Sequence, residues 1–265
     1  VYAQRYDAAG IALGSEFRVN TTTASDQNSP SIAALAGGGF AVSWMSNNQD
    51  GSGWGVYAQR YDANGVAQGS EFRINTVVAG DQAGPSISAL DGGGFAIAWV
   101  SANQDGSAGG IYTQRFDALG AAVGGEFRVN TFTASDQTAP AIAPVPGGGF
   151  VVTWMSNQQD GSDWGVSAQR YGPDGVAQGG EFSVNTTTAY SQSLPGIAAL
   201  SGGGFATVWM SNFQDGSGNG VYARTFTLAN AAPTLDNAIA DQSSDEDAAW
   251  SFQFAADTFG DADGD

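Results

Sequence analysis

The chain has 265 residues, 26 acidic and eight basic, and its formal net charge is −18. All eight basic residues are arginine, and the absence of histidine, cysteine and lysine excludes disulfides, thiolate or imidazole metal sites and the usual nucleophilic triads. The acidic charge disfavours nucleic acid and anionic lipid as partners and favours divalent cations. No apolar run is long enough to insert into a membrane.

A repeat of 55 residues runs through most of the chain. Its clearest copy predicts strands over residues 85–90, 95–100, 111–117 and 125–131, with a glycine turn at 92–94. Four antiparallel strands in each repeat are typical of a propeller blade. We therefore predict an all-β fold in which residues 1–229 form a β-propeller-like array of four-stranded antiparallel blades. Because the third strand occurs five times, the array is either a closed ring or an open arc.

The period stops near Asn230, and residues 230–265 predict a linker followed by the start of a β-sandwich-like domain whose end is missing. The sequence therefore reads as a fragment of a longer protein. Asp261, Asp263 and Asp265 place alternate carboxylates within reach of one cation, which favours a calcium site over a merely acidic turn.

Paired charges recur on the third and fourth strands of each repeat. Alternation places Arg60 beside Asp62, and Glu71 beside Arg73, on one face of a hairpin. A later repeat lacks the equivalents of both Asp62 and Arg73, and a joint loss leaves neither charge without a partner. We therefore predict ion pairs between Arg60 and Glu71 and between Asp62 and Arg73. Their occurrence in each blade favours a structural role over an anion or sialic acid site.

The loop between the second and third strands carries an aspartate in every repeat, followed by glycine and serine. The equivalent residues are Asp50, Asp105, Asp160 and Asp215. Each carboxylate can accept backbone N–H bonds in a tight turn, or it can contribute to a calcium site, which needs six to eight oxygens in all. Both readings stay open, and Ca²⁺ is the one cofactor that we expect.

Two tryptophans in these loops are candidates for ligand binding. Trp54 and Trp164 occupy one repeat position, at which Gly109 and Asn219 stand in the other copies. A tryptophan that some repeats lack can stack on sugar rings, or it can fold over the edge of the blade.

Two stretches resemble known families. The pattern Gly-Gly-Gly-Phe-(x)3-Trp … Gln-Asp-Gly-Ser-(x)2-Gly-Val-Tyr-Ala-Gln-Arg-Tyr-Asp … Glu-Phe-Arg-Val-Asn-Thr resembles repeats of large secreted bacterial proteins, among them calcium-binding repeats-in-toxin proteins and adhesins. The segment from Ala231 to Asp265 resembles the opening of a dystroglycan-type cadherin-like domain. These resemblances imply an extracellular or bacterial cell-surface protein with calcium-dependent structure, whose partners are cell-surface glycans or proteins.

Together these features predict a non-catalytic adhesion and ligand-presenting module. A carbohydrate-binding module that uses the loop tryptophans is the alternative. A propeller glycosidase is less favoured, because it needs an acid pair that breaks the repeat symmetry. The acids outside the repeat pattern, Asp91, Asp163 and Asp174, all lie in predicted turns.

Overall fold

The computed structural model describes residues 1–201, 203–228, 234–235 and 259–260, and these contain 19 strands and one short 3-10 helix. The elements are β1 (Tyr2–Ala3), β2 (Phe17–Arg18), β3 (Gln27–Ala34), β4 (Phe40–Asn47), β5 (Trp54–Tyr61), β6 (Ala67–Arg73), β7 (Gln82–Ala89), β8 (Phe95–Ala102), β9 (Gly109–Phe116), β10 (Ala122–Arg128), β11 (Gln137–Val145), η1 (Pro146–Gly148), β12 (Gly149–Asn157), β13 (Trp164–Tyr171), β14 (Phe182–Ser183), β15 (Gln192–Ala199), β16 (Phe205–Asn212), β17 (Asn219–Phe226), β18 (Thr234–Leu235) and β19 (Phe259–Gly260). The all-β prediction is confirmed.

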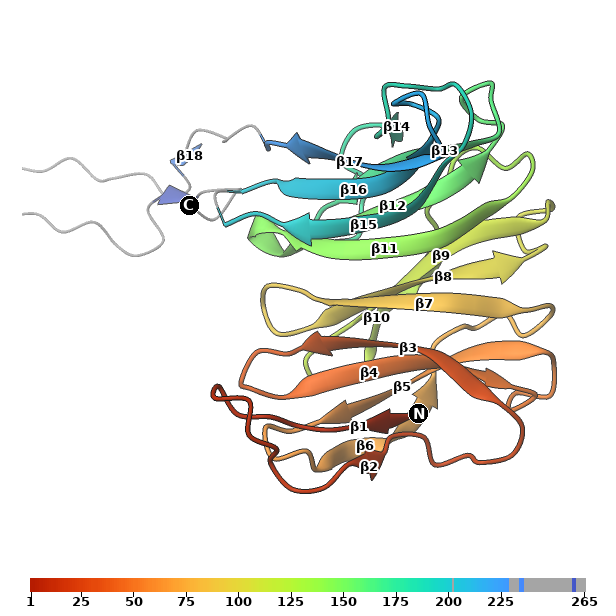
Figure 1. Cartoon of the computed structure of the whole chain (residues 1–265). Helices are drawn as coiled ribbons and strands as arrows, with labels where there is room; N and C mark the ends of the chain where they lie inside the picture. The colour runs from red at the N-terminus through yellow and green to blue at the C-terminus, as the bar shows by residue number, and fades with distance from the viewer. Residues whose placement is uncertain (202, 229–233, 236–258, 261–265) are drawn as a thin grey trace, which may run out of the picture.

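Antiparallel sheets follow one another in chain order, like the blades of a propeller (Figure 1). Three of them, β3–β6, β7–β10 and β11–β14, have four strands, whereas β15–β17 has three strands and β1–β2 has two. The first strands of successive blades are in contact, β3 with β7, β7 with β11 and β11 with β15. The sheets β1–β2 and β15–β17 lie at opposite ends of the stack in Figure 1, so the described array is an open arc.

The second strand of each blade explains how the blades pack. In β8, Phe95, Ile97 and Trp99 are fully buried against residues of the preceding blade. The alternate residues Ala96 and Ala98 are buried against the following blade. The large side chains on one face of the strand fill the interface with the preceding blade. The alanines on the other face leave room for the large side chains of the following blade. The strand is therefore buried on both faces, and the blades form one continuous core.

A buried amide pair joins each blade to the next. Asn75 accepts a hydrogen bond from the backbone N–H of Val56 at 2.8 Å and donates to the Gln82 side chain at 2.9 Å. Gln82, fully buried, donates in turn to the carbonyls of Ala79 and Gly80. The same network forms around Asn130 with Gln137 and around Asn185 with Gln192. Buried amides need such partners, so the network fixes the path from the fourth strand of one blade to the first strand of the next.

The predicted ion pairs are wrong, because the structure gives these side chains other partners. Arg60 donates to the carbonyl of Leu119 in the next blade, and Glu71 accepts the backbone N–H of Thr21 in the preceding blade at 2.6 Å. Asp62 accepts the N–H groups of Asn64 and Val66 within its own turn, both at 2.8 Å. The arginine and the glutamate therefore hold neighbouring blades together, and the aspartate holds a hairpin.

In the repeat that lacks both Asp62 and Arg73, their roles are filled separately. Asp174 accepts the N–H of Val176 at 2.9 Å and so caps the turn in place of an aspartate at position 172. Ser183 donates to the carbonyl of Asn185 at 2.9 Å, as Arg18 does to the carbonyl of Asn20 at 3.0 Å. The paired loss that suggested an ion pair is thus two independent replacements.

The C-terminal predictions fall mostly outside the described residues. Within 230–265 only the short antiparallel pair β18 and β19 is described, and the predicted calcium ligands Asp261, Asp263 and Asp265 lie outside the described residues. No helix in the described part of the chain is long and apolar enough to cross a membrane.

Candidate functional site

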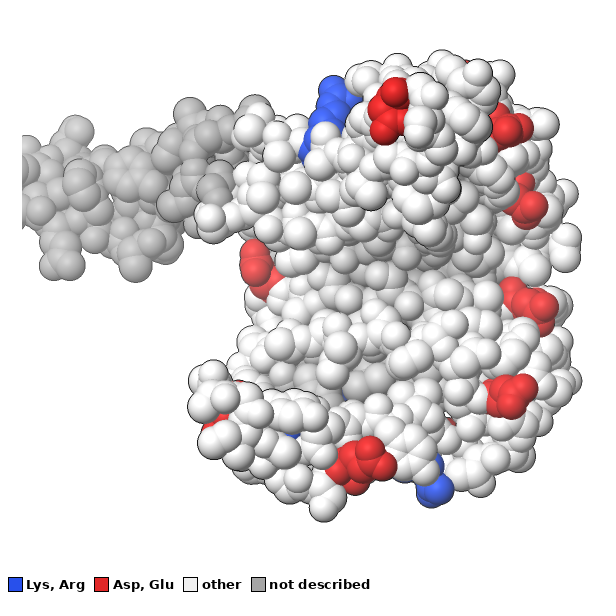
Figure 2. All heavy atoms as spheres, in the orientation of Figure 1, with Lys and Arg blue, Asp and Glu red and all other residues white. Residues whose placement is uncertain are grey.

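The repeated aspartates cap their own loops. Each accepts the backbone N–H of the serine two residues later, at 3.2 Å for Asp50 and at 3.1 Å for Asp105, Asp160 and Asp215. A Cβ on Gly165 would stand 2.6 Å from Oδ2 of Asp160, so only glycine leaves room for this carboxylate. Figure 2 shows acidic side chains spaced along the right-hand side of the stack, the side at which the second strands of the blades end in Figure 1.

The structure supports the turn reading of these loops and does not test the calcium reading. Among the described residues, no three histidine, cysteine, aspartate or glutamate side chains come together as a metal site would require. Calcium binding by Asp50, Asp105, Asp160 and Asp215 stays a prediction, as does the extracellular location.

A second carboxylate and a tyrosine lie near Asp50 and near Asp105. Burial, and then the charge of Asp50, raises the pKa of Tyr57 to about 12, with a smaller contribution from Glu71. Burial, Asp105 and Glu126 raise the pKa of Tyr112 in the same way. Nearby negative charges disfavour the phenolate, so the two acids add to the effect of burial on each tyrosine.

The blade β11–β14 has the two acids without the tyrosine. Ser167 stands where Tyr57, Tyr112 and Tyr222 stand in the other repeats, and Ser183 stands where Arg73 and Arg128 stand. A cavity of about 150 Å³ opens at this place. Its polar lining consists of Ser156, Gln159, Asp160, Ser167, Glu181 and Ser183. The replacement of one large and one charged side chain by serine therefore exposes Asp160 and Glu181 to a common cavity.

Hydrogen bonds hold the Glu181 carboxylate in place. Its Oε2 accepts the backbone N–H of Thr131 at 2.6 Å and the hydroxyl of the same residue at 2.8 Å. Its Oε1 accepts from the side-chain amide of Gln159, whose oxygen accepts the hydroxyl of Ser167 at 3.3 Å. The three contacts from Thr131 and Gln159 are all donated to the carboxylate oxygens of Glu181, which act as acceptors.

The carboxylate of Asp160 is held more loosely. Its Oδ1 accepts the N–H of Ser162 at 3.1 Å, and its Oδ2 accepts the side-chain amide of Asn185 at 3.3 Å. Oδ2 is thus the carboxylate oxygen of this pair with the longest contact. The two acids of the cavity differ in how firmly they are held, and such a difference allows two carboxyl groups to take different roles.

The two tryptophans predicted to bind ligand are half-buried. Trp54 begins β5 and Trp164 begins β13. The backbone N–H of Trp54 donates to the Asp81 carboxylate at 2.9 Å. Neither residue is among the strongly exposed large apolar side chains. Sugar stacking by Trp54 and Trp164 stays a prediction that the structure does not test.

A second, larger hollow lies between the blades β3–β6 and β7–β10. It measures about 540 Å³ and includes Arg60, Asp62 and Gln68 among glycine-rich turns. Arg60 and Asp62 are already engaged in the contacts described above, and Asp62 is the single carboxylate there. The hollow therefore lacks the paired acids that distinguish the cavity of β11–β14.

Comparisons with known proteins found likeness only at the level of structure. No family model and no curated protein matches the chain. An α-L-arabinanase of Penicillium chrysogenum complexed with arabinobiose is 17% identical, with a TM-score of 0.52 over 76% of this chain and 62% of the arabinanase. An endo-arabinase of Bacteroides thetaiotaomicron is 15% identical, with a TM-score of 0.45 over 76% and 75% of the two chains. A thermostable family-43 glycoside hydrolase is 11% identical, with a TM-score of 0.49 over 76% and 71%.

These likenesses correct three predictions. The resemblance to repeats-in-toxin proteins and adhesins was wrong, because the fold is similar to that of an arabinanase. The predictions of a non-catalytic adhesion module and of no enzymatic activity were also wrong. The adhesive role had depended on that resemblance, and the non-catalytic role on the absence of histidine, cysteine and lysine. Asp160 and Glu181 have equivalents in other repeats, and the asymmetry of the cavity of β11–β14 lies in the serines that stand around them.

The sequence analysis missed Glu181 and Ser167 as site residues because it searched for acids present in one repeat alone. The signal was a loss of bulk: serine replaces tyrosine at one position of the third strand, and serine replaces arginine on the facing strand β14. A comparison of side-chain volume at each repeat position would have found both.

Proposed function

We propose that the chain is a glycosidase that uses Asp160 and Glu181 as its carboxyl pair. The observation that carries this proposal is the cavity of β11–β14, where the two acids face a shared space that tyrosine and arginine are positioned to occupy in the other blades. Glycoside hydrolysis needs two carboxyl groups, one to protonate the leaving oxygen and one to act as base or nucleophile. It needs no histidine, cysteine or lysine, and this chain has none.

The contacts of the two acids support an assignment of roles. Glu181 accepts the shorter contacts, from Thr131 and Gln159, and this more firmly held carboxylate is the candidate base or nucleophile. Asp160 has the longer contact at Oδ2, 3.3 Å from Asn185, and this oxygen is the candidate proton donor. Ser167 and Gln159 position Glu181 through their hydrogen bonds.

Charge and size support a neutral, small sugar at the cleavage point. The net charge of −18 repels uronic acids, sialic acid and other anionic glycans. A cavity of about 150 Å³ is smaller than the roughly 300–1,000 Å³ of pockets for drug-sized ligands, so we expect one sugar ring to enter it. The arabinanase with a similar fold was obtained with arabinobiose, and pentose polysaccharides such as arabinan and xylan are therefore the first substrates to test.

Reducing-sugar release from arabinan and xylan tests the proposal. Asp160→Asn and Glu181→Gln should each lower kcat/KM at least about a hundredfold, because each removes a group that acts in the transition state. The matched controls are Asp105→Asn and Glu126→Gln, which make the same changes in the blade where Tyr112 is retained. The controls should keep kcat/KM within about twofold of the parent protein.

Two outcomes would contradict the proposal. One is the absence of any hydrolysis on a broad panel of neutral polysaccharides by the correctly folded parent protein. The other is equal loss in the β7–β10 and β11–β14 variants, which would trace the effect to the stability of the blades. Thermal unfolding of all four variants separates the second outcome from a true loss of activity.

A further inference from the structure

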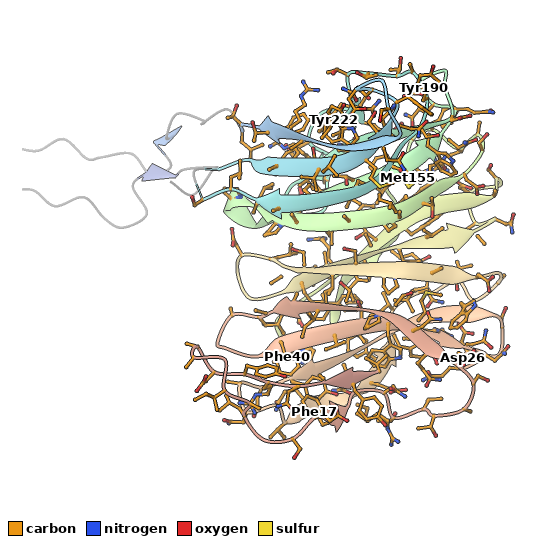
Figure 3. All side chains as sticks on the ribbon, in the orientation of Figure 1. Phe17, Asp26, Phe40, Met155, Tyr190 and Tyr222 are labelled. Atoms are coloured by element: carbon orange, nitrogen blue, oxygen red, sulfur yellow. The ribbon has the colours of Figure 1, made fainter. Side chains whose placement is uncertain are left out.

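Two large aromatic side chains lie exposed and in contact at the last blade. Tyr190 precedes β15 and Phe213 follows β16, and their side chains are 58% and 50% exposed. Their ring centroids are 5.6 Å apart, and the ring planes are tilted by 52°. Figure 3 shows Tyr190 at an outer corner of the stack, next to the blade β11–β14. Single apolar residues scattered over a surface are ordinary, whereas adjacent exposed ones can mark a binding site.

Both aromatics depart from the repeat at positions that do not favour them. The residues equivalent to Tyr190 are Ser25, Gly80 and Ser135, and those equivalent to Phe213 are Asn48, Asn103 and Gln158. All eight positions have φ between 54° and 75°. A positive φ favours glycine and asparagine and is costly for a bulky side chain. Neither the turn geometry nor the core therefore explains why this one repeat has aromatic residues at both positions.

The pair lies against the loop that carries Asp160. The Ser162 hydroxyl donates to the carbonyl of Tyr190 at 3.1 Å, and the Ser191 hydroxyl donates to Asp163 at 3.4 Å. Ser162 and Asp163 follow Asp160 in its loop, and Asp160 lines the cavity of β11–β14. The segment that carries Tyr190 is therefore hydrogen-bonded to the loop whose Asp160 lines the cavity.

We propose that Tyr190 and Phe213 form a stacking platform for a sugar ring of the glycan chain that reaches the cavity. The inference rests on the proposed glycosidase function and adds a second binding position to the same site. Aromatic faces pack against the apolar C–H face of a pyranose or furanose ring and leave its hydroxyls in water. The net charge of −18 disfavours nucleic acids and anionic glycans as occupants, because their phosphate or carboxylate charges are repelled. A neutral oligosaccharide fits both features.

The experiment is oligosaccharide binding to a protein that cannot cleave its ligand. Linear arabino-oligosaccharides of two to six units are titrated by calorimetry into Asp160→Asn alone and into Asp160→Asn combined with Tyr190→Ser and Phe213→Asn. The two added changes copy Ser135 and Asn103, which occupy the same positive-φ positions in other repeats. Tyr6→Ser is the matched control, because Tyr6 is 62% exposed and belongs to the half-blade at the other end of the array.

Removal of the platform should raise Kd for the longer oligosaccharides about tenfold and leave the control unchanged. In the enzyme with intact Asp160, the same two changes should raise KM for arabinan and leave kcat on a short aryl arabinoside unchanged. Equal Kd values with and without the aromatics would overturn the platform. A shift from dimer to monomer on their removal, with no change in Kd, would overturn it too and assign the patch to self-association.

The two proposals fail in different ways. Loss of oligosaccharide affinity in a protein that hydrolyses nothing would keep the platform and refute the glycosidase. Hydrolysis that depends on Asp160 and Glu181, with unchanged KM and Kd in the Tyr190 and Phe213 variant, would keep the glycosidase and refute the platform.

Discussion

The blades β7–β10 and β11–β14 share a loop aspartate and a glutamate at equivalent positions, but the side chains that accompany these two acids differ. In β7–β10, Tyr112 and Arg128 accompany Asp105 and Glu126. In β11–β14 the corresponding residues are Ser167 and Ser183, and Asp160 and Glu181 line a cavity of about 150 Å³. A repeat can therefore gain a cavity beside its acids when smaller side chains replace larger ones, with no new charged residue.

The largest effect is expected when the tyrosine is restored. Ser167→Tyr should fill the cavity and lower kcat/KM on the cleaved polysaccharide by at least about a hundredfold, because substrate can no longer reach the two acids. The free energy of unfolding should stay the same or rise, since the other blades accommodate tyrosine at this position. Steady-state kinetics and urea unfolding of one preparation measure both effects.

The complementary change is Tyr112→Ser in β7–β10. It should open a second cavity, but Arg128 remains beside Glu126 and Asp105, so we expect no gain in activity. Full activity of Ser167→Tyr would show that the reaction occurs elsewhere in the molecule.

The fold was predictable because it depends on patterns that every repeat shows. Alternating large and small residues such as Phe95 and Ala96 signal a strand buried on both faces, and glycine turns separate the strands. The partners of charged residues were not predictable in this way. Arg60 and Glu71 lie near one another on a hairpin, but each contacts a different neighbouring blade. Spacing within one repeat holds no information on contacts between repeats, and these contacts decide the partners of the charged residues. The cavity is lined within one blade, and the small size of Ser167 and Ser183 was visible in the sequence.

The next largest effect is expected on stability, when the contact of Glu71 with the preceding blade is removed. Glu71→Gln should lower the free energy of unfolding by about 1–3 kcal/mol, because the new amide group places a donor against the N–H of Thr21 or the amide of Gln49. Glu16→Gln is the control, since Glu16 is the equivalent residue and is exposed. Similar losses in both variants would show that the contact between blades contributes little.

The same glutamate predicts a dependence on acid pH. Burial acts to raise the pKa of Glu71, but hydrogen bonds from Thr21, Gln49 and Thr22 outweigh it, and the pKa lies below the ordinary 4.5. The stabilisation is therefore present above pH 4.5 and is lost as the pH falls through the folded-state pKa. Urea unfolding between pH 6 and pH 3 should show a smaller loss of stability in Glu71→Gln than in the parent protein.

A smaller effect should appear at alkaline pH. The pKa of Tyr57 is raised to about 12, so the unfolded chain releases this proton near pH 10 while the folded chain retains it. Stability should therefore fall between pH 10 and pH 12, and Tyr57→Phe should make this fall less steep. In the blade β11–β14 serine stands at this position, but burial and the charge of Glu181 raise the pKa of Tyr171 there, so this tyrosine contributes as well. Phenolate absorbance during the titration checks the assignment: ionisation of every tyrosine near pH 10 in the folded protein would contradict it.

The smallest effect is expected for the pair that spacing alone suggested, Asp62 and Arg73. Asp62→Ala should cost about 1 kcal/mol, because the N–H groups of Asn64 and Val66 lose their acceptor, and Arg73→Ser copies Ser183. Since Asp62 acts within its own turn, the double variant should cost the sum of the two single changes to within about 0.5 kcal/mol. A larger coupling energy would restore the ion pair. Additivity would show that β11–β14 lost its aspartate and its arginine independently, which left the cavity beside Ser183 without a structural penalty.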